Sequence, residues 1–181
     1  MPIFILNEEF VFPNPKEAEE GIIAIGGDLN PYRILEAYRR GIFPWYDENS
    51  PILWHSPDPR MVLFPSRLKI SKSMKSLFRK NRFNVTFDRD FSQVIAKCAD
   101  VRYKNRKDTW ITKEIEEAYK QLSQFGWAHS VEVWNKNGQL VGGLYGIVMG
   151  KCFFGESMFS LEDNASKFGF IALVQNLNLR G

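Results

Sequence analysis

A single acidic residue, Glu156, lies in one of the most apolar parts of the sequence. The apolar run VGGLYG at 141–146 leads through Phe153 and Phe154 into GESMFS at 155–160. Burial among apolar neighbours raises the pKa of a carboxyl group, which suits it to proton transfer or to binding a cationic substrate. The segment therefore predicts a strand that holds an acid at the edge of an apolar pocket. The alternative is a glutamate on an edge strand that faces water.

A second feature is a run of cations, because no acid occurs between residues 66 and 87. Such a run attracts phosphates and predicts salt-dependent binding of RNA or DNA. A charge run is also typical of a solvated face, and that interpretation stays open. The cations of this basic segment are Arg67, Lys69, Lys72, Lys75, Arg79, Lys80 and Arg82.

Aromatic residues lie close to a second group of arginines. Cations along a phosphate backbone, combined with rings that stack on unpaired bases, are typical of proteins that bind single-stranded RNA ends. Taken singly, each tryptophan is better explained by core packing. Together they indicate a surface for a nucleobase. The tryptophans are Trp45, Trp54 and Trp110, and the arginines are Arg39, Arg40 and Arg60.

The composition describes a globular protein whose overall charge does not mark it as a nucleic-acid binder. The 181 residues are 44% hydrophobic, enough to bury the core of one large domain or two small lobes. Lys and Arg number 24 against 21 Asp and Glu, which leaves a net charge of +3. Any binding of RNA or DNA therefore depends on where the cations lie.

Cysteine and histidine usage indicates a reducing compartment and no metal centre. Cys98 and Cys152 are too few for a disulfide framework and lack metal-ligand spacing, and His55 and His129 add no zinc pattern. The first residues have neither the apolar length nor the basic flank of a signal peptide or membrane span. We therefore expect a cytoplasmic protein.

Periodicity and capping residues predict helices alternating with strands. Asn30 and Pro31 begin a helix that Gly41 ends, Ser71 and Thr112 cap two more, and Asn137-Gly138 is typical of a hairpin. The proline-rich segment 41–60 predicts an ordered, aromatic-lined loop. The predicted helices lie at 31–38, 72–78, 91–99, 113–125 and from 163 or 164 towards 179, and the predicted strands at 61–64, 83–87, 129–134, 139–148 and 151–154.

This order of elements predicts the α+β class with two lobes. The change of character between residues 104 and 108 is the predicted boundary. Residues 1–105 would form a small mixed α/β lobe with the aromatic loop and the basic segment. Residues 106–181 would form a lobe with an antiparallel-rich sheet and flanking helices.

Several motifs in this order resemble those of the leucyl/phenylalanyl-tRNA–protein transferases. One short pattern arises easily by chance, whereas several long ones in the same order do not. The motifs are GGDL at 26–29, YRRGIFPW at 38–45, WHSPDPR at 54–60, TWIT at 109–112, HSVEVW at 129–134 and GESMFS at 155–160.

The resemblance implies transfer of leucine or phenylalanine, with methionine a further candidate, from aminoacyl-tRNA to the amino-terminal arginine or lysine of a protein. The product would be a degradation signal. It also implies a GNAT-like fold for the second lobe, but no Gly-rich turn is present to bind the pyrophosphate of CoA. The absence of this turn favours tRNA over CoA as the donor. Because the ester of aminoacyl-tRNA is already activated, we expect no metal, ATP or other cofactor. We also expect a monomer.

The resemblance also implies roles for individual residues. Glu156 corresponds to a residue of the polar network around the attacking amine. Trp45 and Trp110 correspond to positions around the terminal adenosine, with Tyr119 a plausible neighbour, and Arg39, Arg40, Arg60 and the basic segment would bind tRNA. The apolar surround of the aminoacyl side chain would be Leu144, Phe153, Met158, Phe170, Leu173 and Leu177.

One difference from the family concerns the carboxyl-terminal end. The family's chain passes from its last helix into a buried strand with an Asp-x-Gln pair, whereas this sequence ends at Arg180 and Gly181. Without that strand an inner sheet edge would be left open. We therefore expect little or no transferase activity from these 181 residues alone, with part of substrate binding retained.

Two other functions stay open from the sequence. A Fem-like enzyme would use aminoacyl-tRNA to modify cell-wall peptides instead of protein termini. A non-catalytic RNA-binding module would use the cations and rings without any chemistry at Glu156.

Overall fold

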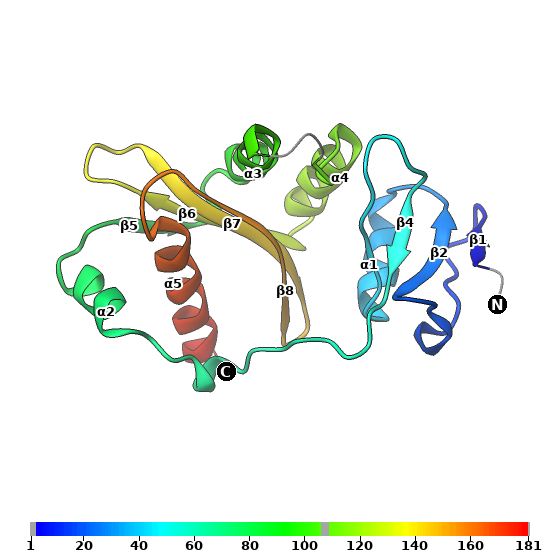
Figure 1. The fold of residues 1–181 in the computed structure, drawn as a ribbon, viewed down its shortest axis with the longest axis horizontal. Helices are drawn as coiled ribbons and strands as arrows, with labels where there is room; N and C mark the ends of the chain where they lie inside the picture. Colours follow the sequence, from blue (N-terminus) through cyan, green and yellow to red (C-terminus); the bar gives the residue numbers. More distant parts are fainter. Residues whose placement is uncertain (1–2, 106–108, 181) are drawn as a thin grey trace. The chain divides into compact units, whose positions relative to one another are not determined.

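The protein forms two compact units. This computed structural model describes residues 3–105 and 109–180. Unit 1 is built from Met1–Met61 and Arg102–Leu122, and unit 2 from Val62–Val101 and Ser123–Gly181. Helices and sheets occur together, which confirms the α+β class (Figure 1). The boundary predicted at residues 105 and 106 adjoins 106–108, which lie outside the described residues, and it stays a prediction.

Unit 1 has a sheet of short strands in the order β1-β2-β4-β3. β1 runs parallel to β2, and the other neighbours are antiparallel. The prediction of a loop over 41–60 is partly wrong, because β3 and β4 pair inside it; β3 is an edge strand, where a proline is tolerated. The strands are β1 (Phe4–Leu6), β2 (Ile22–Gly26), β3 (Phe43–Pro44) and β4 (Leu53–His55).

The two predicted helices of this region are confirmed, together with their caps. The side chain of Asn30 accepts a hydrogen bond from the backbone N–H of Tyr32 at the start of α1 (Pro31–Arg39). Thr112 Oγ1 accepts one from the N–H of Ile115 at the start of α4 (Lys113–Gln124). Each cap satisfies a donor that the first helical turn leaves without a partner. A short 3-10 helix, η1 (Pro15–Glu17), precedes β2.

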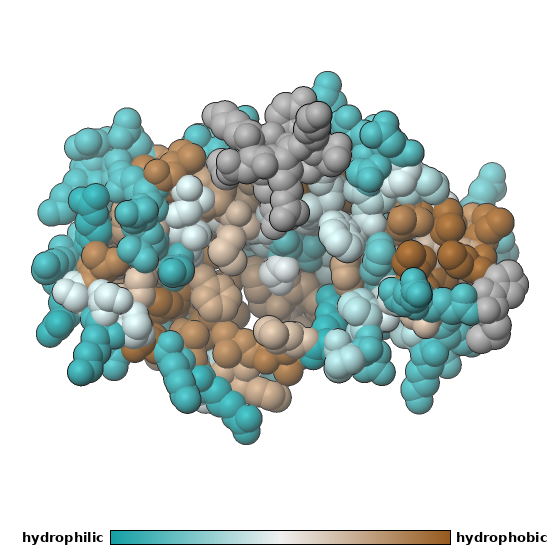
Figure 2. Space-filling view, viewed as in Figure 1, coloured by the Kyte–Doolittle hydropathy of each residue, from teal (hydrophilic) through white to brown (hydrophobic). Residues whose placement is uncertain are grey.

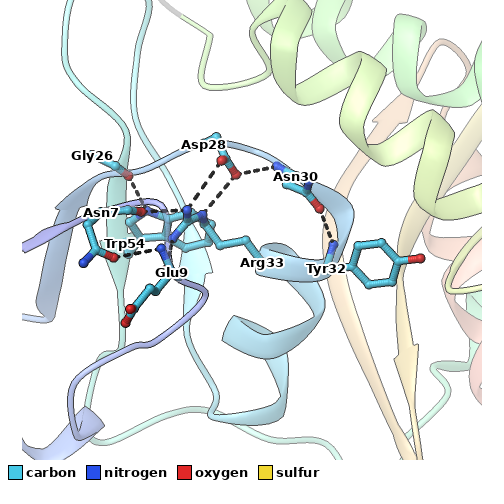
Figure 3. Close-up of polar contacts among 8 residues, drawn as sticks. All are labelled: Asn7, Glu9, Gly26, Asp28, Asn30, Tyr32, Arg33 and Trp54. Atoms are coloured by element: carbon cyan, nitrogen blue, oxygen red, sulfur yellow. Dashed lines mark hydrogen bonds and ion pairs between the residues drawn. The ribbon is translucent and has the colours of Figure 1, made fainter.

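A buried arginine fixes the first residues of unit 1 to α1 (Figure 3). The guanidinium of Arg33 donates to the carbonyl oxygens of Asn7 at 2.8 Å and Glu9 at 2.9 Å, and to the Asp28 carboxylate at 3.0 Å. The arginine is fully buried, whereas Asp28 is exposed. The hydrogen bond from Arg33 also lowers the pKa of Asp28. One cation therefore holds a segment that has little regular structure of its own.

Unit 2 has a four-stranded antiparallel sheet in the order β5-β6-β7-β8, which confirms the predicted meander. Gly138 has a φ of +74° at the hairpin between β6 and β7. The last strand is longer than the predicted 151–154, because it continues through Glu156. The strands are β5 (Asn84–Phe87), β6 (Ala128–Trp134), β7 (Leu140–Met149) and β8 (Cys152–Ser160).

Helix α5 (Ala165–Arg180) lies across β6 and β7 on one face of this sheet (Figure 1). A Cβ built at Gly142 would lie 2.7 Å from Ala165 Cβ, and one at Gly169 would lie 2.7 Å from Val133 Cγ2. Glycine therefore permits the close approach of helix and sheet. On the opposite face, α3 (Phe91–Asn105), which is longer than the predicted 91–99, brings Phe91 edge-on to Tyr145.

Helix α2 (Lys72–Arg79) is confirmed, and Phe78 stacks on Phe168 of α5 with ring centroids 3.7 Å apart. The predicted strand at 61–64 is wrong. These residues are exposed and form no ladder within the described chain, and the 3-10 helix η2 (Pro65–Arg67) follows them. Proline on both sides, at Pro59 and Pro65, breaks the extended run.

Candidate functional site

Glu156 occupies a β-bulge in β8. Tyr145 pairs with Ser157 and the next residue of β7, Gly146, pairs with Gly155, so Glu156 is an extra residue between these two pairs. Bulges re-aim side chains and are common next to active sites. Glu156 is half-buried. The predicted acid therefore lies at the one irregular point of the β7–β8 ladder.

Glycine at position 146 is required by the close packing beside this bulge. A Cβ built there would overlap the carbonyl oxygen of Phe154 and lie 2.5 Å from Phe153 Cζ. Gly155, opposite in register, would meet only Phe153 Cε1 at 3.7 Å, an ordinary contact. The ring of Phe153 thus occupies the space that a side chain at 146 would need.

Five of the six residues predicted to surround the aminoacyl side chain lie in one apolar cluster of unit 2. Leu144 and Leu173 are buried there together with Val131, and the partly buried Phe153, Phe170 and Leu177 pack against them. Val85 of β5 is a further neighbour. Apolar surface gathers beside α5 in Figure 2. Residues far apart in the sequence therefore meet in one cluster, and its role around an aminoacyl side chain stays a prediction.

The sixth residue, Met158, does not belong to this cluster. Its position pairs with Leu144 across the ladder, but its side chain is 47% exposed. Next to it, the Ser157 hydroxyl is buried and has no hydrogen-bond partner among the described residues. Sequence reasoning gave Ser157 no role, although it follows Glu156 directly.

Glu132 is a fully buried carboxylate to which the sequence analysis gave no role. It accepts hydrogen bonds from Thr86 Oγ1 and Ser130 Oγ, both at 2.6 Å, and from the backbone N–H groups of Arg89 and Asp90. These donors connect β5, β6 and the turn before α3. The arrangement satisfies a buried acid and fixes the sheet to the helix. The motif HSVEVW alternates polar and apolar residues, and this alternation was the sequence feature that could have drawn attention to Glu132.

Three aromatic side chains and one arginine form a continuous strip at β3 and β4 of unit 1. The His55 ring stacks on Phe43 with centroids 5.9 Å apart and meets Trp45 edge-on at 5.4 Å. The Arg60 guanidinium lies 4.7 Å from the Phe43 centroid and donates to the carbonyl oxygen of Gly41. Trp45 is 53% exposed. We call Arg60, Phe43, His55 and Trp45 the aromatic strip.

Burial lowers the pKa of His55, whereas its hydrogen bond with the Trp45 carbonyl raises it by less. A lowered pKa favours the neutral imidazole near pH 7. With His55 neutral, Arg60 is the one cation of the aromatic strip, and it lies at the opposite end from the exposed indole of Trp45. Arg60 and Trp45 were predicted to bind RNA, but Phe43 and His55 were not, although WHSPDPR includes the histidine.

The remaining aromatic candidates lie deeper in unit 1. Trp110 is half-buried and Trp54 is fully buried, with its indole N–H donated to the carbonyl oxygen of Gly26. Tyr119 is fully buried and its hydroxyl lies 2.8 Å from that of Tyr38. Core packing therefore describes Trp54 and Tyr119, while Trp45 and Trp110 offer surface.

Most cations of the basic segment are exposed, and the side of unit 2 around α2 carries mainly hydrophilic side chains (Figure 2). Across residues 3–105 and 109–180, Lys72, Lys75 and Arg79 form no ion pair. Arg82 differs, because Glu162 accepts its hydrogen bond at 3.0 Å. Three more cations of the basic segment are exposed and form no ion pair within that part of the chain: Arg67, Lys69 and Lys80.

The arginines of α1 are engaged inside unit 1. Arg40 donates to Glu36 at 2.8 Å and to the carbonyl oxygen of Phe12 at 3.1 Å, while Arg39 lies 3.4 Å from the same glutamate. The hydrogen bond from Arg40 lowers the pKa of Glu36. Arg39 is therefore the more available of the two for a phosphate.

In the described part of the chain, every helix is too short or too polar to cross a membrane. Among these same residues, no three His, Cys, Asp or Glu side chains gather into a group able to hold a metal ion. The expectation that the reaction needs no metal and no other cofactor stays a prediction.

Comparisons with known proteins cover nearly the whole chain. A family model described as leucyl/phenylalanyl-tRNA protein transferase matches residues 62–181, and the model of its N-terminal domain matches residues 27–58. A leucyl/phenylalanyl-tRNA–protein transferase of Syntrophus aciditrophicus is 54% identical over 180 residues, which cover 99% of this chain and 75% of that protein.

Two further relatives carry the same name. The protein of Syntrophobacter fumaroxidans is 53% identical over 182 residues, covering 100% of this chain and 77% of that protein. The protein of Pseudomonas fluorescens strain SBW25 is 52% identical over 184 residues, covering 100% of this chain and 80% of that protein. With two family models and relatives of this similarity, the chain belongs to the leucyl/phenylalanyl-tRNA–protein transferases, a family of transferase enzymes.

Proposed function

We propose that this protein moves leucine or phenylalanine, with methionine a further candidate, from aminoacyl-tRNA to the amino-terminal arginine or lysine of proteins. The observation that carries the proposal is the similarity to transferases of that name over 98–100% of the chain at 51–54% identity. The modified proteins would be marked for degradation, in the cytoplasm and by a monomeric enzyme.

The chemistry is aminolysis of an ester. A bond forms between the acceptor nitrogen and the aminoacyl carbonyl carbon, the carbonyl–ribose oxygen bond breaks, and the ribose hydroxyl leaves with a proton. The attacking α-amine has an ordinary pKa near ~8, so a proton must be removed from it. Because the ester is already activated, positioning supplies most of the rate and no metal or ATP is needed.

Glu156 is our candidate for a polar group beside the attacking amine. Its bulge interrupts the alternation of β8 next to an apolar cluster, an arrangement that supports a role in binding or proton transfer. The negative charge would also favour an acceptor whose first side chain is arginine or lysine.

The apolar cluster is our candidate surround for the aminoacyl side chain. Leucine and phenylalanine are apolar, and Leu144, Leu173 and the ring of Phe153 offer an apolar environment. Discrimination among apolar donors should be poor, because one methylene in an apolar pocket is worth only ~1–3 kcal/mol.

The tRNA would be held by stacking and by charge. An exposed indole at Trp45 suits a base at a single-stranded 3′ end, with Trp110 as a second candidate. The basic segment, with Arg39, Arg40 and Arg60, would bind phosphates. The most available cations are Lys72, Lys75 and Arg79 on the exposed side of α2.

The test is transfer of radiolabelled leucine from leucyl-tRNA to a peptide that begins with arginine. It uses a version of the relatives' full length, because the chain spans 75% and 77% of the first two relatives. We expect Glu156→Gln to lower the transfer rate by roughly 100-fold while RNA binding is unchanged. The matched control is Glu117→Gln, an exposed acid on α4 that should keep the wild-type rate.

Three results would contradict the proposal. Transfer only to a cell-wall peptide would indicate a Fem-like enzyme. RNA binding without transfer to either acceptor would indicate a binding module, and full transfer by Glu156→Gln would remove that residue from the chemistry.

A further inference from the structure

The imidazole of His55 contacts both the backbone and the indole ring of Trp45. His55 Nε2 lies 2.9 Å from the carbonyl oxygen of Trp45. Because a carbonyl oxygen can only accept, Nε2 must carry the hydrogen, and in the neutral ring Nδ1 is then without one. The backbone N–H of Trp45 also donates to the carbonyl oxygen of Leu53 at 2.9 Å. Residue 45 is thus held by β4 at both of its backbone polar groups.

The imidazole also lies between two aromatic side chains. It meets the indole of Trp45 at an interplanar angle of 61° and stacks on Phe43 at 28°. Phe43 is in turn covered by the guanidinium of Arg60, which is fixed by its hydrogen bond to the Gly41 carbonyl. The imidazole therefore has a defined place, and it supports the edge of a half-exposed indole.

A supported indole is a better surface for a base than a mobile one. A side chain that is free before binding loses rotamer freedom when a ligand stacks on it, and one that is already held loses less. A residue that holds the indole can therefore raise affinity without touching the ligand.

We propose that His55 is a positioning residue that holds the indole of Trp45 ready for the terminal adenosine of tRNA. This inference rests on the proposed function, because it requires Trp45 to be a ligand-binding surface. His55 itself contacts no substrate in this role.

The first experiment measures binding of a short fluorescent RNA ending in CCA by fluorescence anisotropy. His55→Ala should weaken binding roughly 3- to 10-fold, the range expected for losing the pre-ordering of one side chain. His55→Phe keeps a ring against Phe43 and Trp45 but loses the donor, and it should recover part of the affinity. His129→Ala, which removes a half-buried histidine paired with Asp88, is the matched control and should bind as wild type.

A spectroscopic measurement separates positioning from general loss of structure. With 5-fluorotryptophan incorporated, fluorine NMR gives one signal for each of the five tryptophans, and Trp45→Phe assigns that of Trp45. His55→Ala should shift or broaden the Trp45 signal more than any of the other four. If all five signals change, His55→Ala acts by unfolding the protein. The positioning role is then judged from His55→Phe, in which the Trp45 signal should change more than the other four.

The outcomes distinguish the inference from the proposed function. If Trp45→Ala abolishes RNA binding while both His55 variants keep wild-type affinity and the wild-type Trp45 signal, the positioning role is wrong and the proposed function stands. Should wild type fail to bind the RNA, or Trp45→Ala bind as well as wild type, the proposed adenosine surface itself is wrong.

Discussion

The two units use their cations in opposite ways. In unit 1, Arg33, Arg40 and Arg60 all donate to backbone carbonyl oxygens. In unit 2, Lys72 and Lys75 are exposed side chains on a helix whose other face packs against α5. Short strands leave many carbonyl groups outside the ladder, so unit 1 needs side-chain donors, whereas the long strands of unit 2 satisfy their own backbone. These three arginines help to hold unit 1 together, whereas Lys72 and Lys75 of unit 2 are available for a ligand.

The units also differ in how close packing is achieved. Gly142, Gly143, Gly146 and Gly169 in unit 2 each occupy a position where an added Cβ would lie within 3.0 Å of a neighbouring atom. The glycines at 21, 26 and 41 in unit 1 have positive φ angles and more space. Unit 2 should therefore be sensitive to the volume of an added methyl group, and unit 1 to removed donors.

The largest expected effect is that of Gly146→Ala. The new methyl group would overlap the Phe154 carbonyl in the middle of a strand, so we expect a loss of about 3–5 kcal/mol in the free energy of unfolding. Gly155→Ala, directly opposite, meets one ordinary contact and should cost less than about 1 kcal/mol. Urea denaturation of both variants is the measurement, and equal losses would refute the packing argument.

Next in size is Arg33→Met. The change removes a fully buried guanidinium and leaves the carbonyl oxygens of Asn7 and Glu9 without their donor, and we expect it to cost about 2–4 kcal/mol. Arg39→Met is the control, because its ion pair with Glu36 is exposed and should be worth less than about 1 kcal/mol. Thermal denaturation that gives similar values for both would show that unit 1 does not depend on buried donors.

Neutralising three cations of α2 should affect binding and not folding. With Lys72, Lys75 and Arg79 changed to Gln, the slope of log affinity for tRNA against log salt should fall by roughly 2–3. The single change Arg82→Gln should alter the slope less, because Glu162 already neutralises that arginine. An unchanged slope in the triple variant would make these cations part of a solvated face.

The smallest effect concerns pH. Burial holds the folded-state pKa of His55 below its ordinary value near ~6.5, so the neutral ring is favoured in the folded protein. The stability linked to His55 is therefore fully present above pH ~6.5 and is lost as the pH falls through the lower folded-state pKa. The free energy of unfolding, measured by urea denaturation at pH 7.5 and at a pH below 6, gives this loss. His55→Phe should reduce it, and an equal loss in that variant would exclude His55 as its source.

Local signals in the sequence were sufficient for most of unit 2 and for the helices. Ser71, Thr112 and Asn30 each cap a helix where predicted, and Asn137-Gly138 forms its hairpin. In unit 1, none of the four strands was predicted, and in β3 and β4 proline and tryptophan conceal any alternation. The strand predicted at 61–64 is wrong because pairing needs a neighbour, which a local apolar run does not reveal.

The candidate site was predictable in its residue types but not in its geometry. Glu156 stood out as a lone acid, yet the bulge that carries it follows from the register of two strands and leaves no local mark. The resemblance brought together Leu144, Phe153 and Leu173, whereas Met158 fell outside the cluster. His55 contacts residues ten and twelve positions away, which only the folded hairpin shows.

The ring of Phe153 fills space that would otherwise belong to residue 146, so one side chain serves two positions of the sheet. If the apolar cluster holds the aminoacyl side chain as we propose, residue 153 is the place to change the size of the donor that fits. Shortening residue 153 would open apolar space beside the cluster of Val131, Leu144 and Leu173. Enlarging residue 146 offers no such route, because the backbone itself stands in the way.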